Sequence, residues 1–355
     1  MKKIILTGGG TAGHVTPNLA LLPALKAEDF EIHYIGSKDG LERGLVESTG
    51  IPYHPISAGK LRRYMSAKNI TDIFRVIRGF GDAISVIRRL KPDIVFSKGG
   101  FVTVPVLAAA RMLRVKCVVH ESDLTPGLAN RLSQPFTNKI CVSFPETLVH
   151  VPERKGVLTG SPIREELLKG DADKGLKMCE WSGGGKPVIL VTGGSQGSAA
   201  INACVREVLG ELLSKFRVVH LCGKGNLSGI NKPGYAEFEY VQEGLEDLFA
   251  MADVAISRAG ANTLFELLAL RKPNLLIPLS MEASRGDQIL NAESFALQGF
   301  SMLLPENKMT PERLLNDIEM LYNEREIYIA NMAAHKQGDG VAQIMDVLKD
   351  TLEGL

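Results

Sequence analysis

Residues 6–14 read Leu-Thr-Gly-Gly-Gly-Thr-Ala-Gly-His, a glycine-rich turn that directly follows a short apolar run. A buried strand that ends in closely spaced glycines and opens a helix is typical of the first βα unit of a Rossmann-type domain. The same arrangement returns at residues 191–195, Val-Thr-Gly-Gly-Ser, ahead of a second helical pattern. This internal repeat predicts an α/β protein with two Rossmann-like domains.

Short β-rich runs alternate with helical patterns along the chain, as in parallel sheets with crossover helices. The expected strands are residues 3–7, 32–35, 94–97, 117–120, 140–143, 188–192, 217–222, 238–241, 254–257 and 274–278. The polar stretch 169–186 is expected to be a surface linker. We therefore expect one domain over residues 1–163 and another over 164–355, with a last helix that can pack back on the first domain. Because ligands bind at the carboxyl ends of such strands, the two glycine loops should face a common cleft.

Bulk properties exclude several classes of protein. The 355 residues carry a formal net charge of +1, so nucleic acid is not an expected partner. The N-terminal apolar run is too short for a signal peptide, and no uncharged run reaches the roughly 18 residues of a membrane span. Five scattered cysteines fit reduced thiols in the cytoplasm and predict no metal site.

The loop at residues 8–13 contains a literal GxGxxG, the fingerprint of NAD and FAD domains. Such a domain needs an acidic residue at the end of its second strand, but residues 32–35 are followed by Gly-Ser-Lys. A Walker A sequence is absent, and the Asp-x-Asp pair of Asp171 and Asp173 lies in the expected linker. Two interpretations of this glycine loop remain. Its backbone can approach a phosphate at the N-terminus of the following helix, or it forms a tight turn that binds no ligand.

Seven stretches resemble the MurG family of glycosyltransferases and occur in the family's order: residues 7–17, 98–105, 120–130, 161–164, 192–198, 257–270 and 278–292. The resemblance covers nearly the whole chain and implies the two-domain GT-B architecture. It also implies inverting transfer of N-acetylglucosamine from UDP-N-acetylglucosamine to undecaprenyl-diphospho-N-acetylmuramoyl-peptide, the step from lipid I to lipid II in peptidoglycan synthesis. A peripheral enzyme at the cytoplasmic face of the cell membrane is expected, without a redox or organic cofactor and without a resident metal.

The resemblance also assigns the donor site, mainly to the second domain. The matching positions are Thr11, Ala12, Gly13, Asp123, Arg164, Ser195, Gln242, Ala261, Asn262, Glu266, Gln288 and Asn291. Glu266 matches the carboxylate that holds the ribose hydroxyls, and Gln242 the position whose backbone meets the uracil. Two positions depart from the family pattern: it often has Asn where this chain has Asp123, and Gly where this chain has Ala12. A carboxylate at residue 123 can accept from a sugar hydroxyl but cannot donate to it.

Inverting transfer needs a base for the acceptor hydroxyl, and His14 is the first candidate because imidazole titrates near neutrality. Glu121 is the second. An alternative for His14 is that it only hydrogen-bonds a phosphate or orients the loop. The acceptor's diphosphate is expected on the N–H groups of Gly10, Gly99 and Gly100, in the first and third glycine loops.

Residues 60–91 contain nine cations and two anions, a local charge of about +7 in a nearly neutral protein. Apolar residues recur there at helical spacing, from Ile70 to Ile87. This stretch, with Arg75, Arg78, Arg88 and Arg89, is expected to contact anionic lipid of the inner membrane face. The alternative is an ordinary domain helix with a solvated basic face.

The residues alone do not exclude two other functions. One is a different two-domain UDP-sugar enzyme, such as a UDP-N-acetylglucosamine epimerase, which would turn over the UDP-sugar without a lipid acceptor. The other is a non-catalytic nucleotide-sugar-binding protein. Several candidate residues also have ordinary structural roles open to them: Glu266 as a helix-surface residue, Asn262 as a helix cap and Arg258 as an ion-pair partner.

Overall fold

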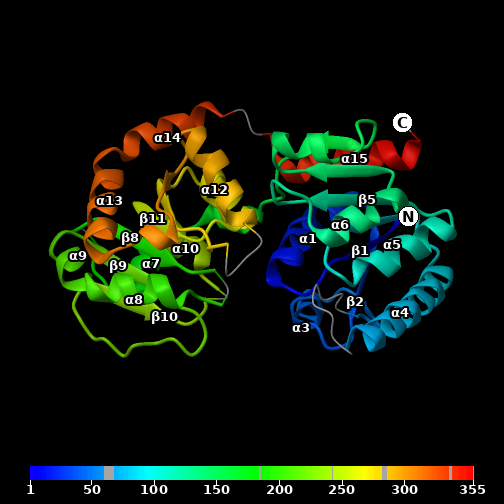
Figure 1. Ribbon diagram of the computed structural model, residues 1–355, viewed down its shortest axis with the longest axis horizontal. Coiled ribbons are helices and arrows are strands. Elements are labelled where there is room, and N and C mark those ends of the chain that lie inside the picture. The colour runs from blue at the N-terminus through cyan, green and yellow to red at the C-terminus, as the bar shows by residue number, and fades with distance from the viewer. Residues whose placement is uncertain are drawn as a thin grey trace. The chain divides into compact units, whose positions relative to one another are not determined.

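The computed structural model describes residues 1–59, 68–183, 185–194, 196–241, 243–281, 286–335 and 338–354. Two expected donor residues, Ser195 and Gln242, lie outside the described residues. The chain divides into two compact units, each containing one parallel sheet (Figure 1). Unit 1 consists of Met1–Arg164 and Gln337–Leu355, and unit 2 of Glu165–Lys336. The described segments contain no helix that is both long and apolar enough to cross a bilayer.

The sheet of unit 1 has seven strands in the order β3-β2-β1-β4-β5-β6-β7, all parallel. Their bounds are β1 Lys3–Thr7, β2 Glu31–Ser37, β3 Tyr53–Ile56, β4 Ile94–Ser97, β5 Lys116–Glu121, β6 Lys139–Val142 and β7 Gly156–Leu158. The central strands are continuous apolar runs because helices cover both faces of the sheet. The strand order reverses between β1 and β4, the point where open α/β sheets bind their ligands.

Two layers of helices build the core of unit 1. Their bounds are α1 Thr16–Ala20, α2 Leu22–Ala27, α3 Leu41–Glu47, α4 Lys68–Leu90, α5 Thr103–Met112, α6 Leu128–Ser133 and α15 Gly340–Glu353. On one face of the sheet, α4 and α5 pack through Ile87 and Val106. On the other, Ile344 and Leu348 of α15 join the core formed by Leu21 and Leu25. The last helix, red in Figure 1, therefore completes the unit that contains the N-terminus.

Unit 2 repeats the design with six parallel strands in the order β10-β9-β8-β11-β12-β13. The strands are β8 Val188–Thr192, β9 Arg217–Leu221, β10 Tyr235–Phe238, β11 Val254–Ser257, β12 Asn274–Leu276 and β13 Met302–Leu303. The helices are α7 Ala172–Met178, α8 Ala199–Glu207, α9 Leu209–Lys215, α10 Leu245–Met251, α11 Ala261–Ala269, α12 Asp287–Leu297, α13 Pro311–Asn323 and α14 Arg325–Ala334. Here the strand order reverses between β8 and β11.

The stretch 169–186, which was expected to be a surface linker, contains the helix α7. The Asp171 carboxylate caps this helix by accepting from the Asp173 N–H at 2.9 Å. A Cβ on Gly175 would lie 2.4 Å from the Asp247 carbonyl, so α7 packs closely against α10. The Asp-x-Asp pair is thus a helix cap of unit 2.

Candidate functional site

The first and third glycine loops of unit 1 touch through their backbones. The Gly9 N–H donates to the Gly99 carbonyl at 3.3 Å, and a Cβ on Gly100 would lie 2.2 Å from the Gly9 carbonyl. Gly10, Gly99 and Gly100 have φ angles of +90°, +96° and +94°, a region that glycine enters without steric cost. The three glycines expected at the acceptor diphosphate therefore lie in adjoining loops, at the carboxyl ends of β1 and β4.

A buried carboxylate that the sequence analysis did not identify supports the first loop. Glu42, in the first turn of α3, accepts from the Gly10 N–H at 3.2 Å and from the Ser37 N–H at 2.9 Å. A Cβ on Gly9 would lie 2.6 Å from its Oε1. The only signal in the sequence that could have identified Glu42 is its place about one turn after the second strand. In every other respect it resembles an exposed glutamate on a helix surface. The Gly10 N–H is thus engaged by this carboxylate.

His14 ends a short 3₁₀ turn, Ala12–His14, that follows Thr11. Its Nδ1 lies 3.1 Å from the Gly9 carbonyl oxygen and 3.1 Å from the Thr11 hydroxyl. A carbonyl oxygen only accepts, so the proton belongs on Nδ1 and the basic lone pair on Nε2. The loop thus sets the tautomer of His14, while Thr11 and Gly13 are exposed and Ala12 is half-buried.

Glu121, at the end of β5, holds the loop that follows it. Its carboxylate accepts from the N–H groups of Asp123 at 3.1 Å and Gly127 at 2.9 Å, and from Asn130 Nδ2 at 2.8 Å. A Cβ on Gly99 would lie 3.0 Å from the Asn130 side chain, so this loop adjoins the third glycine loop. Burial, with a contribution from Asp123, raises the pKa of Glu121 to about 7. Asn130 and the buried Lys98 are further members that the sequence did not single out.

In unit 2 the glycine loop after β8 leads into α8. A Cβ on Gly193 would lie 2.3 Å from the Ser198 nitrogen, and Gly194 has a φ of +84°. Ser198 caps α8 by accepting from the Ile201 N–H at 3.3 Å. The Ser198 hydroxyl also accepts from Arg258 Nη2 at 2.6 Å. Arg258 is buried and pairs with Glu306, in agreement with the ion-pair role left open above.

The other donor candidates of unit 2 lie on α11 and α12. Ala261 and Asn262 open α11, and Glu266 follows Asn262 by one turn on the same helix. Gln288 and Asn291 of α12 bond to the backbone: Gln288 Oε1 accepts from the Leu279 N–H at 3.1 Å, and Asn291 Nδ2 donates to the Ala259 carbonyl at 3.3 Å. These bonds tie the segments after β11 and β12 to α12.

All four lipid-contact candidates lie on α4, which also carries exposed apolar side chains. Phe74 and Ile77 are 67% and 62% exposed, although they belong to the apolar pattern of the helix. Arg75 and Arg78 are exposed on the same helix, and Arg88 and Arg89 are exposed in its last turn. Arg164, a donor candidate, is half-buried at the end of the N-terminal segment of unit 1.

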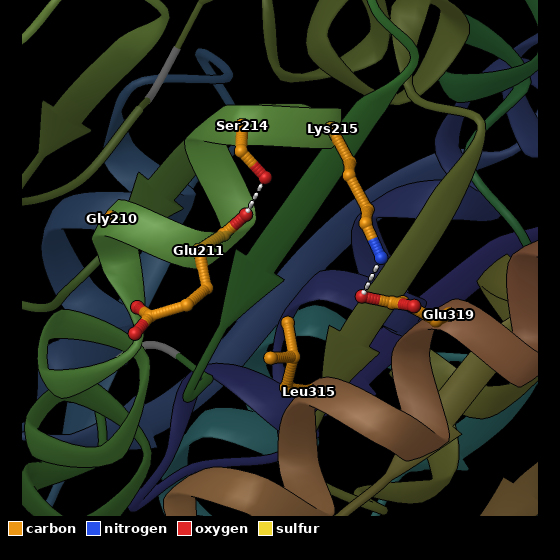
Figure 2. Close-up of a pocket in the computed structure, with 6 residues that line it drawn as sticks. All are labelled: Gly210, Glu211, Ser214, Lys215, Leu315 and Glu319. Carbon is orange, nitrogen blue, oxygen red and sulfur yellow. Dashed lines mark hydrogen bonds and ion pairs between the residues drawn. The ribbon is translucent and has the colours of Figure 1, made fainter.

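A surface pocket of unit 2 lies apart from these residues (Figure 2). It is lined by Gly210, Glu211, Ser214, Lys215, Leu315 and Glu319, from α9 and α13. Lys215 and Glu319 satisfy each other in an ion pair of 2.7 Å, and Leu315 is the main apolar side chain of the wall. Among the described residues, no group of three or more His, Cys, Asp or Glu is arranged to hold a metal ion.

Comparison with known proteins gives family-level matches over both units. Residues 4–142 match the N-terminal domain of glycosyltransferase family 28, and residues 188–348 match its C-terminal domain. A protein of Lachnospira eligens is 56% identical over 352 residues, with 99% of each chain covered. It is named UDP-N-acetylglucosamine–N-acetylmuramyl-(pentapeptide) pyrophosphoryl-undecaprenol N-acetylglucosamine transferase.

Two solved structures have a similar fold. MurG of Acinetobacter baumannii superimposes with a TM-score of 0.76 at 22% identity, covering 99% of this chain and 100% of that one. A putative UDP-N-acetylglucosamine 2-epimerase of Listeria monocytogenes gives 0.73 at 15% identity, covering 100% and 98%. At such identities the likeness concerns the fold, which both kinds of enzyme share.

Proposed function

The chain belongs to glycosyltransferase family 28, within it to the MurG transferases, and we infer that it transfers N-acetylglucosamine from UDP-N-acetylglucosamine to undecaprenyl-diphospho-N-acetylmuramoyl-peptide. The observation that carries this is 56% identity, along 99% of both chains, to a curated transferase of that name. With this reaction we also propose a role in peptidoglycan synthesis, and through it in cell-wall growth, cell shape and division. The epimerase alternative rests on a shared fold at 15% identity.

We propose that unit 2 binds the UDP part of the donor. Backbone N–H groups at the start of α11 suit a diphosphate, because a helix N-terminus carries partial positive charge. Glu266, one turn further along, offers a carboxylate that can accept from both ribose hydroxyls. The Arg258 guanidinium, which donates to the Ser198 hydroxyl at the end of the loop after β8, adds positive charge beside that loop.

We propose His14 as the general base. Its Nδ1–H is fixed on the Gly9 carbonyl, which leaves Nε2 as the atom that accepts the proton of the attacking hydroxyl. The three hydrogen bonds that Glu121 accepts favour a role in shaping the loop after β5 over direct proton transfer. The Gly10 N–H donates to Glu42 and the Gly99 N–H to the Ser97 hydroxyl, so of the three predicted N–H groups we keep only that of Gly100 for the acceptor's diphosphate.

We propose that α4 brings the enzyme to the cytoplasmic face of the cell membrane as a peripheral protein. Exposed Phe74 and Ile77 can enter the headgroup region, while Arg75 and Arg78 pair with anionic lipid. Each cation near a charged surface adds about 1 kcal/mol of attraction. The described part of α4 therefore combines both elements of an interfacial helix.

The deciding experiment is transfer of labelled sugar from UDP-N-acetylglucosamine to a synthetic lipid-linked muramyl peptide. Formation of the disaccharide lipid, dependent on that acceptor, is the expected result. Release of a rearranged sugar from the donor without acceptor would favour the epimerase. Tight binding of UDP-N-acetylglucosamine with no product under any condition would identify a binding protein.

A further inference from the structure

The glycine loop after β8 packs against a second loop, which follows β9. A Cβ on Gly197 would collide with the Cys222 carbonyl oxygen, and a Cβ on Gly223 would collide with the Gln196 carbonyl. The φ angles of these two glycines are +75° and +88°, so the backbone conformation also requires glycine at both positions. The position of the Cys222 carbonyl therefore determines how closely the two loops approach each other.

A buried amide holds that carbonyl in place. Asn202 belongs to α8, the helix that the glycine loop opens, and only 2% of the residue is exposed. Its Nδ2 donates to the Cys222 carbonyl oxygen at 2.9 Å, and its Oδ1 lies 2.9 Å from His220 Nε2. An amide turned the other way would place Oδ1 against the Cys222 carbonyl, which is also an acceptor. The orientation of the Asn202 amide therefore decides whether the bond to Cys222 forms.

His220, on β9, fixes this orientation. The residue is fully buried, and burial, followed by the charge of Arg206, lowers its pKa to about 4, so the ring is neutral and carries one proton. Because Asn202 Oδ1 only accepts, that proton belongs on Nε2. The Tyr235 hydroxyl lies 3.0 Å from Nδ1 and 2.5 Å from Glu237 Oε1, and its single proton serves these two acceptors. The ring is thus held from both of its nitrogens.

We propose that His220 is a positioning residue of the donor site: it orients the Asn202 amide, which holds the Cys222 carbonyl against the glycine loop after β8. All of these contacts lie within unit 2. The inference rests on the proposed function, in which unit 2 binds the UDP part of the donor. A loop that is already held in one position loses less freedom when it binds a phosphate, so its support should be measurable as UDP affinity.

The test compares His220→Leu with His220→Gln, with UDP binding measured by calorimetry. Leucine cannot donate to Asn202, so UDP affinity is expected to fall about tenfold. A glutamine amide can donate to Asn202 Oδ1 from near the place of Nε2, so His220→Gln should stay within about threefold of the wild-type affinity. In transfer assays of His220→Leu, the donor KM should rise more than kcat falls. Wild-type UDP affinity in His220→Leu would overturn the proposal.

Asn202→Ala tests the same link and covers the case in which His220→Leu folds poorly. It removes the bond to Cys222 directly and should weaken UDP binding as much as His220→Leu does. The double variant should lose no more affinity than either single variant, because both substitutions break one chain of contacts. Losses of affinity that add up in the double variant contradict the proposal.

Lys272→Met is the matched control for a buried polar side chain of unit 2. Its ammonium lies by the amino ends of β11 and β12 and donates to the carbonyls of Ala250 and Ala252. Its replacement should lower the melting temperature, as His220→Leu does, and leave UDP affinity unchanged. If both variants lose UDP affinity in proportion to their loss of melting temperature, His220 supports only the fold of unit 2.

Amide hydrogen exchange in the ligand-free chain gives a readout that needs no donor. Residues 196–201 should exchange faster in His220→Leu and Asn202→Ala than in the wild-type chain, and at the wild-type rate in His220→Gln. Unchanged exchange of these residues in His220→Leu would also overturn the proposal. If the wild-type chain transfers no sugar, the proposed function fails, while the exchange rates still test whether His220 supports the loop.

Discussion

The glycine loops after β1 and β8 share a sequence pattern, but side chains of opposite charge support them. The first is fastened by the Glu42 carboxylate, which accepts from the Gly10 N–H. The second is fastened by the Arg258 guanidinium, which donates to the Ser198 hydroxyl. Because like charges repel, a diphosphate gains more over the second loop than over the first. A glycine pattern thus predicts a turn, whereas the sign of the buried charge that supports the turn indicates whether it can bind an anion such as a diphosphate.

The largest effect is expected at the first loop, where we propose that His14 acts as the general base. His14→Ala should lower kcat about 10²–10⁴-fold, the range for a positioned general base. UDP affinity should change little, and the acid limb of wild-type kcat should vanish. His14→Gln can donate to a phosphate but cannot take a proton, so near-normal kcat in that variant would remove His14 as the base.

The second loop should respond in binding and stability. Arg258→Met leaves Glu306 without its buried partner and should lower the free energy of unfolding by about 3 kcal/mol, measured in urea. UDP affinity, from calorimetry, should fall as well. Glu42→Gln in the first loop is the counterpart, and we expect it to alter the acceptor KM while UDP affinity is retained. Equal losses of UDP affinity in both variants would show that the supporting charges do not distinguish the loops.

Glu266→Ala sharpens the assignment of the nucleotide to unit 2. Loss of the carboxylate leaves the ribose hydroxyls without an acceptor and should weaken UDP binding by about 1.5–3 kcal/mol. 2′-Deoxy-UDP should lose less affinity on the same substitution. Asn331→Ala, on α14 of the same unit, is a control that should leave UDP binding unchanged. Unchanged affinity in Glu266→Ala would make Glu266 an ordinary helix-surface residue.

The smallest effect concerns the lipid surface. Arg78→Ala should weaken sedimentation with anionic vesicles by about 1 kcal/mol and leave UDP affinity untouched. Raising the salt should reduce the difference in vesicle binding between the wild-type chain and Arg78→Ala. Salt shortens the Debye length, which is about 8 Å at physiological ionic strength, and so screens the attraction. Arg43→Ala, which removes an exposed cation paired with Glu47 on α3, is the control. If vesicle binding changes neither with salt nor with Arg78→Ala, the lipid contact lies elsewhere on the protein.

Local patterns were enough to predict much of the fold. The strand at 3–7 and the strand at 188–192 match β1 and β8, because a buried parallel strand followed by glycines is a strong short-range signal. The strand β3 was missed because Tyr53–Ile56 contains proline and lies at the sheet edge. The helix expected after the first glycine turn forms as α1 and α2, each with a proline in its first turn.

The site was less accessible to sequence reasoning wherever its contacts are long-range. Local spacing and the family resemblance predict His14 and Glu121 as candidate bases. Glu42 and Lys98 look like surface residues, because nothing near them in the chain indicates that they are buried. Periodicity likewise found the apolar stripe of α4 but could not show that Ile87 enters the core while Phe74 faces solvent.

The return of α15 to unit 1 has a consequence for biosynthesis. Ile344 and Leu348 belong to the core of the unit that contains β1, yet the ribosome makes them after all of unit 2. Unit 2 can therefore fold during translation, whereas the first unit waits with an uncovered apolar face until its last helix emerges. That interval is when the nascent chain is most exposed to aggregation and most dependent on chaperones.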